Sequence, residues 1–132
     1  MLLDDGWSDV DRKNGTLRSF GADPSRFPKG LSHTVRLLKD EFGVKYVGVW
    51  QAFQGYWNGL DESGVAAASC PTAITTTANG CLIPGSRAEQ PAQFWDAWDG
   101  ELAEAGVDFV KVDSQSSTSV MVRGTEIGRA HV

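Results

Sequence analysis

The stretch Val107-Asp108-Phe109-Val110-Lys111-Val112-Asp113 decides how this chain is expected to fold. It lies between Gly106 and the polar run Ser114-Gln115-Ser116-Ser117, and β-branched and aromatic residues dominate it, so it predicts a strand buried on both faces, as in a parallel sheet. Lys111 and Asp113 are two residues apart, so their side chains leave the same face of that strand. Charges at the carboxyl end of a core strand cost free energy unless they pair or take part in chemistry. We therefore expect a functional site at this end.

Upstream of this strand, the chain alternates between strand and helix patterns. An apolar stripe at helical spacing predicts a helix that begins at Leu31 and ends at Gly43, and a second stripe predicts another helix from Pro91 to Gly106. The residues from Val44 to Trp50 predict a second buried strand, and Met1 to Asp5 have the pattern of the last half of a strand. This order predicts parallel strands joined by helices.

Two long connections interrupt this pattern. Residues 8–30 carry several turn signals, including Asn14-Gly15, and predict a polar loop with a few apolar anchors. Residues 51–90 predict an irregular loop, and loops of that length inside compact domains are usually functional.

The carboxyl ends of parallel strands meet at one edge of a sheet, where such folds bind their ligands. We therefore expect several polar and aromatic side chains to converge there: Asp4, Asp5, Trp50, Lys111 and Asp113. Asp108 begins the last strand, about 17 Å from Asp113, so it cannot be the catalytic partner of that residue.

The composition narrows the class of partner. The chain has 132 residues, with 12 Lys and Arg against 17 Asp and Glu and a net charge of -5. It has no basic stripe, which argues against nucleic acid and against an anionic membrane. The start Met1-Leu2-Leu3-Asp4-Asp5 lacks the features of a signal peptide or a membrane helix, which favours the cytoplasm, although an upstream segment could be missing.

Five tryptophans stand out in this composition. Trp7, Trp50 and Trp57 follow strand-like segments, where their rings could stack on a sugar, but each could equally be a packing residue. Trp95 and Trp98 lie on a predicted helix and are expected to pack against the sheet. Cys70 and Cys81 fit free or loop-stapling cysteines better than a metal site, and His33 has no partner at ligand spacing.

Four motifs in order resemble glycoside hydrolase family 36, in its branch of raffinose synthases and seed imbibition proteins, the alkaline α-galactosidases. They are Leu2-Leu3-Asp4-Asp5-Gly6-Trp7, then Phe27-Pro28-Lys29-Gly30-Leu31, then Tyr46-Val47-Gly48-Val49-Trp50 with Gly55-Tyr56-Trp57, and Val110-Lys111-Val112-Asp113-Ser114-Gln115. Each motif alone is weak evidence, and their order makes the resemblance specific.

The resemblance implies an α/β fold in which residues 1–124 form part of a catalytic (β/α)8 barrel. The three parallel strands would be barrel strands two to four, with two intervening helices. It further implies that Asp113 is the nucleophile of a retaining enzyme that works by double displacement on α-galactosides such as galactinol, raffinose or melibiose. Asp4, Asp5 and Lys111 would contact galactose hydroxyls, and Lys111 would also keep Asp113 ionised.

The chain departs from the family pattern in one important respect. The acid/base aspartate of the family comes from a later strand than those present here, so we expect the chain by itself to be an inactive fragment. Residues 125–132 resemble a translated adapter and are expected to be a non-native tail. The reaction class needs two carboxylates and neither a metal nor an organic cofactor. Hydrolase and galactosyltransferase activities both remain open for the parent enzyme, and a non-catalytic carbohydrate-binding or orphan fragment is the alternative.

Overall fold

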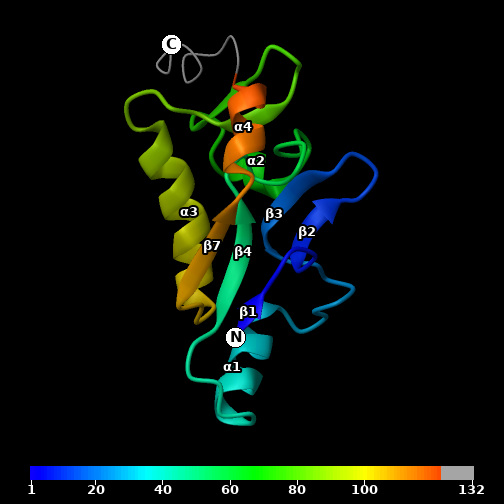
Figure 1. The fold of residues 1–132 in the computed structure, drawn as a ribbon, viewed down its shortest axis with the longest axis vertical. Helices are drawn as coiled ribbons and strands as arrows, with labels where there is room; N and C mark the ends of the chain where they lie inside the picture. Colours follow the sequence, from blue (N-terminus) through cyan, green and yellow to red (C-terminus); the bar gives the residue numbers. More distant parts are fainter. Residues whose placement is uncertain (123–132) are drawn as a thin grey trace.

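Three parallel strands form the central sheet of the protein. The computed structural model describes residues 1–122, so the expected tail at 125–132 lies outside the described residues. The strands are β1 (Leu2–Leu3), β4 (Gly48–Ala52) and β7 (Phe109–Asp113), in the spatial order β1-β4-β7. Leu3 pairs with Val49, which pairs with Val110 on its other side. All three strands point toward the same end of the molecule, as predicted (Figure 1).

Two long helices connect these strands. Helix α1 (Leu31–Asp40) lies between β1 and β4 in the chain, and α3 (Gln90–Glu104) lies between β4 and β7. Pro91 stands in the first turn of α3, as its sequence position predicts. The predicted helix extends too far, because α1 ends at Asp40, and Phe42, the last apolar residue of the predicted stripe, lies beyond that end and is 71% exposed.

Strand β4 begins later than predicted. The sequence pattern predicts a strand from Val44 to Trp50. In the structure, the backbone N–H of Val44 still closes the end of α1 by donating to Leu38 O at 3.0 Å. Gly48 starts the strand, and all residues from Gly48 to Ala52 are buried.

The prediction of a loop at residues 8–30 was wrong, because this segment contains a β-hairpin. Its strands are β2 (Ser8–Asp11) and β3 (Thr16–Ala22), and the Asn14-Gly15 turn signal joins them, with Gly15 at φ 68°. Leu17 and Phe20 on β3 are buried, so the apolar anchors of the expected loop are the inward face of a strand.

Residues 51–90 are more regular than predicted. They contain the short helix α2 (Val65–Ser69) and a second hairpin of β5 (Ile74–Thr76) and β6 (Leu82–Pro84). Leu60 bridges both hairpins, pairing with Leu17 on one side and with Leu82 on the other. The two hairpins therefore form one layer with Leu60 at its centre.

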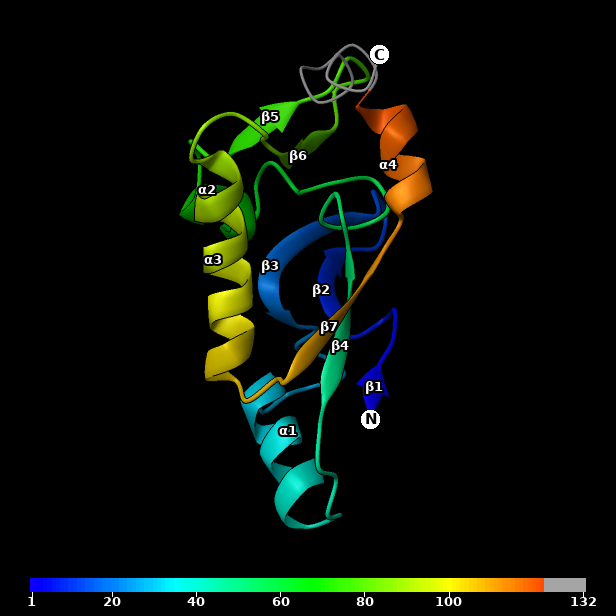
Figure 2. The same cartoon turned by 60° about the vertical axis from the view of Figure 1, so that its left-hand side comes forward.

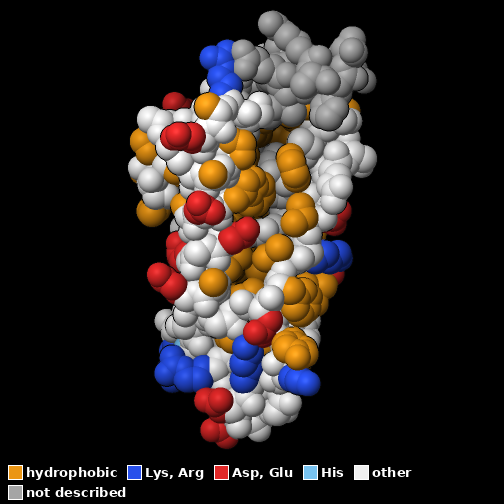
Figure 3. Space-filling view, turned by 90° about the vertical axis from the view of Figure 1, so that its left-hand side faces the viewer, with side chains coloured by type: hydrophobic (Ala, Val, Ile, Leu, Met, Phe, Trp, Pro, Cys, Tyr) orange, Lys and Arg blue, Asp and Glu red, His pale blue; other side chains and the backbone are white. Residues whose placement is uncertain are grey.

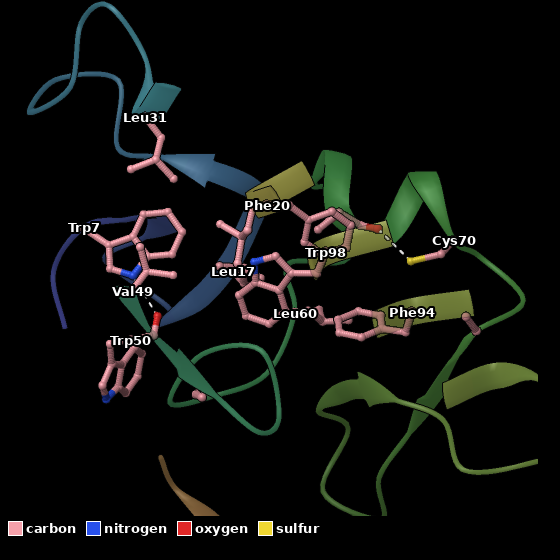
Figure 4. Close-up of a cluster of buried hydrophobic side chains, with 14 of the residues drawn as sticks. Trp7, Leu17, Phe20, Leu31, Val49, Trp50, Leu60, Cys70, Phe94 and Trp98 are labelled. Atoms are coloured by element: carbon pink, nitrogen blue, oxygen red, sulfur yellow. Dashed lines mark hydrogen bonds between the residues drawn. The ribbon is translucent and has the colours of Figure 1, made fainter. Parts of the chain in front are cut away.

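The core lies between one face of the parallel sheet, α3, α1 and β3. Figure 4 shows its aromatic centre, where Phe20 stacks on Trp98 with ring centroids 5.5 Å apart and Phe94 meets both rings edge-on. Trp98 is thus buried, and the ring on which it stacks belongs to β3 of the first hairpin. Trp7 is also part of this core at 3% exposed, and its indole N–H donates to Trp50 O at 2.7 Å, so it is unavailable for stacking on a sugar.

Strand β7 is not buried on both faces, and this prediction was wrong. Phe109 is 44% exposed and Val110 is 37% exposed. Within residues 1–122, β4 is the strand that pairs with β7, so the opposite edge of β7 and part of its surface stay open. Figure 3 shows hydrophobic side chains gathered along the face that carries α3 and β7.

The remaining elements are brief. Helix α4 (Gln115–Met121) starts directly after β7. Cys70 and Cys81 are both free cysteines. Within residues 1–122, no helix combines the length and the hydropathy that a membrane span requires.

Candidate active site at the carboxyl ends of the strands

The residues predicted to converge do lie together at the carboxyl end of the parallel sheet. Figure 2 shows the strands running toward the end of the molecule where α4 begins. In β4 and β7, Trp50 pairs with Lys111 and Ala52 pairs with Asp113, so Trp50, Lys111 and Asp113 share one face of the sheet. The opposite face of β4 carries Val49, which packs into the core. Trp50 on the site face is itself buried and belongs to the same hydrophobic core, so the site is built directly on that core.

Asp113 has both carboxylate oxygens held by hydrogen-bond donors. The indole N–H of Trp50 donates to its Oδ2 at 3.1 Å, and the backbone N–H of Ser114 donates to its Oδ1 at 2.7 Å. These two hydrogen bonds, in that order, hold the pKa of Asp113 below its ordinary value, and the charge of Lys111 contributes less. The sequence pattern assigned this effect to Lys111, whereas the structure gives the larger part to Trp50.

Lys111 reaches across the sheet to Asp4. Its Nζ lies 3.2 Å from Asp4 Oδ2 and 3.3 Å from Oδ1, and both side chains are about half exposed. Leu3, the last residue of β1, pairs with Val49, so Asp4 follows directly after the strand, next to Trp50. Lys111 on β7 and Asp4 just after β1 therefore lie on either side of Trp50 on β4.

Asp5 binds two residues of the loop that follows β4, Tyr56 and Trp57, and this loop is called the aromatic loop below. The phenol of Tyr56 donates to its Oδ1 at 2.9 Å, and the indole N–H of Trp57 donates to its Oδ2 at 2.9 Å. Burial and the nearby carboxylate raise the pKa of Tyr56 to about 12, so its hydroxyl stays a donor at neutral pH. Asp4 and Asp5, although adjacent, thus bind different groups.

The aromatic rings form one wall beside Asp113. Trp50 packs against Trp57 with ring centroids 5.7 Å apart, and Tyr56 meets Trp50 nearly edge-on at 5.9 Å. Trp50 is almost fully buried, while Trp57 is 46% exposed. Trp57 is therefore the predicted tryptophan whose ring offers free surface for stacking at this end of the sheet.

Sequence reasoning missed two residues that support the site, Gln54 and Thr118. Gln54 is buried, accepts a hydrogen bond from Thr118 Oγ1 at 2.9 Å, and donates to Trp57 O at 3.3 Å. It thereby joins the aromatic loop to α4, the helix that follows Asp113. Neither residue belongs to an apolar stripe or a charged motif, so their pairing could not be found from periodicity. Tyr56 lies inside the motif Gly55-Tyr56-Trp57, but the sequence alone predicted no role for it.

The backbone directly after Asp113 is strained. Ser114 is a non-glycine residue at φ 65°, a conformation that costs an L-residue about 1–2 kcal/mol. It turns the chain from β7 into α4, and the Thr118 hydroxyl, whose one proton is shared with Gln54 Oε1, lies 2.7 Å from its carbonyl oxygen. Strain of this kind gathers at functional sites, where the surrounding structure holds it in place.

Asp108 lies at the opposite end of β7 and has a structural role. Its Oδ2 accepts from Lys39 Nζ at 2.8 Å and from the backbone N–H of Val47 at 2.8 Å. These bonds tie the start of β7 to α1 and to the chain that enters β4. Among residues 1–122, no group of three or more His, Cys, Asp or Glu side chains could hold a metal ion.

The arrangement has the components of a site for a sugar. It places a carboxylate with fixed orientation and lowered pKa beside an exposed indole ring and an ion pair that can bond hydroxyl groups. Carboxylates and aromatic rings side by side are the groups that glycoside chemistry uses.

Comparison with known proteins finds one family and several relatives. The model of the family described as raffinose synthase or seed imbibition protein Sip1 matches residues 16–131. The chain is also similar to three proteins of Arabidopsis thaliana. It is 32% identical to probable galactinol–sucrose galactosyltransferase 1, over 94% of this chain and 22% of the relative. It is 29% identical to number 6 over 87% and 20%, and 27% identical to number 5 over 86% and 20%.

The chain spans about a fifth of the length of these relatives. The family match covers most of the chain, including the strand that ends in Asp113. The chain therefore belongs to the family of raffinose synthases and seed imbibition proteins.

Proposed function

We propose that this chain supplies the nucleophile and part of the sugar-binding wall of an enzyme that transfers α-galactosyl groups by double displacement. The observation that carries the proposal is the carboxylate of Asp113, held by Trp50 and Ser114 with a lowered pKa at the carboxyl end of a parallel sheet. A retaining glycosidase needs one such ionised carboxylate. The names of the Arabidopsis relatives, galactinol–sucrose galactosyltransferases, suggest a galactosyl donor and a sugar acceptor.

In the first step, an oxygen of Asp113 bonds to C1 of the galactosyl unit as the glycosidic C–O bond breaks. The departing oxygen takes a proton from an acid that the described residues do not supply. In the second step, the oxygen of a sugar hydroxyl or of water attacks C1, the bond to Asp113 breaks, and the attacking oxygen gives its proton to the same acid group. A sugar acceptor makes the enzyme a transferase, and water makes it a hydrolase.

The other residues of the site bind and orient the galactosyl unit. Trp57 offers its exposed ring to the apolar face of the sugar, and the ion pair of Lys111 and Asp4 meets its hydroxyl groups. Asp5 acts mainly through Tyr56 and Trp57, because its two oxygens accept their hydrogen bonds.

We also propose that the sheet is part of a (β/α)8 barrel. Helices alternate with the parallel strands in the chain, and Trp50, Lys111 and Asp113 lie at the carboxyl ends of β4 and β7, where a barrel carries its site residues. The open edge of β7 is where the next barrel strand would pair.

Covalent labelling tests the role of Asp113 directly. The probe is a fluorosugar of galactose configuration with fluoride at C1, because fluoride leaves without a proton donor and the test therefore needs no acid residue. We expect peptide mass analysis to find one sugar on Asp113, no label in Asp113→Asn, and unchanged labelling in the control Asp96→Asn. Label at another residue, or equal labelling of Asp113→Asn, would refute the assignment.

Product analysis then separates the two outcomes of the second step. The enzyme that contains this segment together with its acid residue is incubated with galactinol and sucrose, and separately with an aryl α-galactoside. A galactosylated sucrose supports the transferase, and free galactose from both donors supports the hydrolase. Sugar binding without either product favours a non-catalytic carbohydrate-binding protein.

A further inference from the structure

A polar groove lies between the tips of the two hairpins, outside the site described above. It has a volume of about 400 Å³, within the range of small-molecule sites. Six polar side chains line this asparagine groove: Asn14, Thr16, Asn58, Glu62, Thr76 and Asn79. Leu60 and Leu82 supply apolar surface between them.

The backbone holds the two sides of the asparagine groove together. Leu60 pairs with both hairpins, and its N–H donates to Leu82 O at 2.7 Å. Asn58 ties the first hairpin to the same segment, since its Nδ2 donates to Asn14 O at 2.8 Å and its N–H donates to Gly15 O at 2.9 Å. The groove is therefore formed in advance and needs no loop to close.

The groove adjoins the proposed galactosyl site through consecutive residues. The side chain of Trp57 bonds Asp5, whereas the side chain of Asn58 bonds the hairpin turn and lines the groove. Trp57 and Asn58 are adjacent in the chain, so the wall of one site continues directly into the wall of the other.

The lining selects the chemistry of the ligand. It contains no Lys or Arg among the described residues, so an anion would find no counter-charge, and its one carboxylate, Glu62, is too few for a cation site. Its side-chain amides and hydroxyls offer both donors and acceptors, and among the described residues the side chains of Thr76 and Asn79 have no protein partner and are open to a ligand. Neutral donors and acceptors around a small apolar surface suit a molecule with many hydroxyl groups.

We propose that the asparagine groove is a second carbohydrate subsite that binds a neutral saccharide, as a galactosyl acceptor is. The proposal rests on the function proposed above for Asp113 and adds where the second sugar binds. Asn58 and Asn79 bond its hydroxyls from the two hairpins, and Leu60 and Leu82 contact its apolar edge.

The test titrates the ¹⁵N-labelled chain with sucrose and follows the side-chain amide signals by NMR. We expect saturating shifts at Asn58 and Asn79 with sucrose, and none with glycerol at the same concentration of hydroxyl groups. Thr76→Ala combined with Asn79→Ala should weaken sucrose binding by about tenfold, a loss equal to one good hydrogen bond. Thr75→Ala is the matched control, because Thr75 neighbours Thr76 on β5 and points to the other face.

The outcomes separate this proposal from the function on which it rests. If sucrose leaves Asn58 and Asn79 unshifted while the fluorosugar still labels Asp113, the groove proposal is wrong and the catalytic proposal stands. If sucrose shifts them but Asp113 takes no label, the groove is a sugar site and its role as an acceptor subsite is overturned. Equal sucrose affinity in the Thr75 and Thr76/Asn79 variants also contradicts the proposal.

Discussion

Replacing Gln54 with leucine should loosen the site without removing any residue that touches the sugar. Gln54 is 1% exposed and joins two segments, through Thr118 on α4 and through the backbone of Trp57 on the aromatic loop. Gln54→Leu keeps a side chain of similar volume and removes both hydrogen bonds. The change therefore tests the polar connection rather than the packing.

The expected loss of stability follows from those two bonds. Each neutral hydrogen bond contributes about 0.5–1.5 kcal/mol net, so we expect Gln54→Leu to lower the free energy of unfolding by roughly 1–3 kcal/mol. The value should lie in the lower half of that range, because the bond to Trp57 O is long at 3.3 Å and Thr118 keeps its bond to Ser114 O at 2.7 Å.

Urea unfolding followed by tryptophan fluorescence measures this loss, and galactose titration of the folded chain measures the effect on the site. Galactose binding should weaken, because Trp57 and the helix behind Asp113 lose their common support. Gln93→Leu is the matched control, since Gln93 also accepts from a threonine, Thr72, at 3.4 Å, but on the exposed surface. That control should change the free energy of unfolding by less than about 0.5 kcal/mol.

A double-mutant cycle isolates the pair itself. Thr118→Val leaves the buried Gln54 oxygen without its partner, whereas the double variant removes both polar groups, so the double loss should be about 1 kcal/mol smaller than the sum of the single losses. If Gln54→Leu costs no more than Gln93→Leu, or if the two buried changes are simply additive, the connection does not support the site.

Three further predictions concern charge and packing. Trp50→Phe should raise the pKa of Asp113, because the variant loses the hydrogen bond that lowers this pKa most; the ¹³C shift of the carboxyl carbon measured against pH checks this. The hydrogen bond from Lys39 lowers the pKa of Asp108 most, and the hydrogen bond from the Val47 amide lowers it further. The stability that Asp108 contributes is therefore present above its unfolded pKa and is lost as pH falls through its folded pKa. The free energy of unfolding of Asp108→Asn should depend less on acid pH than that of the parent, which urea unfolding at several pH values measures. Gly48→Ala should cost about 1–3 kcal/mol in urea unfolding, since its methyl group would lie 2.2 Å from the ring of Phe109, and Phe109→Ala in the same chain should recover part of the loss.

Local patterns in the sequence were sufficient for the main elements. The stripe that begins at Leu31 predicted α1, the stripe that runs up to Gly106 predicted α3, and Pro91 marked the first turn of the second helix. The apolar run before Asp113 predicted the last strand. These predictions succeed because helix and strand periodicity record which face of each element is buried, and that information is local.

The same local patterns failed where short strands pair with distant residues. The hairpin of β2 and β3 has turn signals but mixed polarity, because its outer face meets water, so the sequence predicted a loop. Leu60, which joins both hairpins, is a single apolar residue without periodic neighbours. The exposure of Phe109 was also missed, since an apolar strand pattern records a buried face whether or not the described chain covers it.

By itself, the sequence determined that Asp4, Asp5, Trp50, Lys111 and Asp113 meet, because parallel strands that end in polar residues bring those residues to one edge. Tertiary structure alone decided what each of them bonds. Trp50 rather than Lys111 became the main partner of Asp113, and Trp57 became the partner of Asp5. The physical reason is that strand alternation specifies a face, whereas a hydrogen bond of about 3 Å depends on the loops that return across that face.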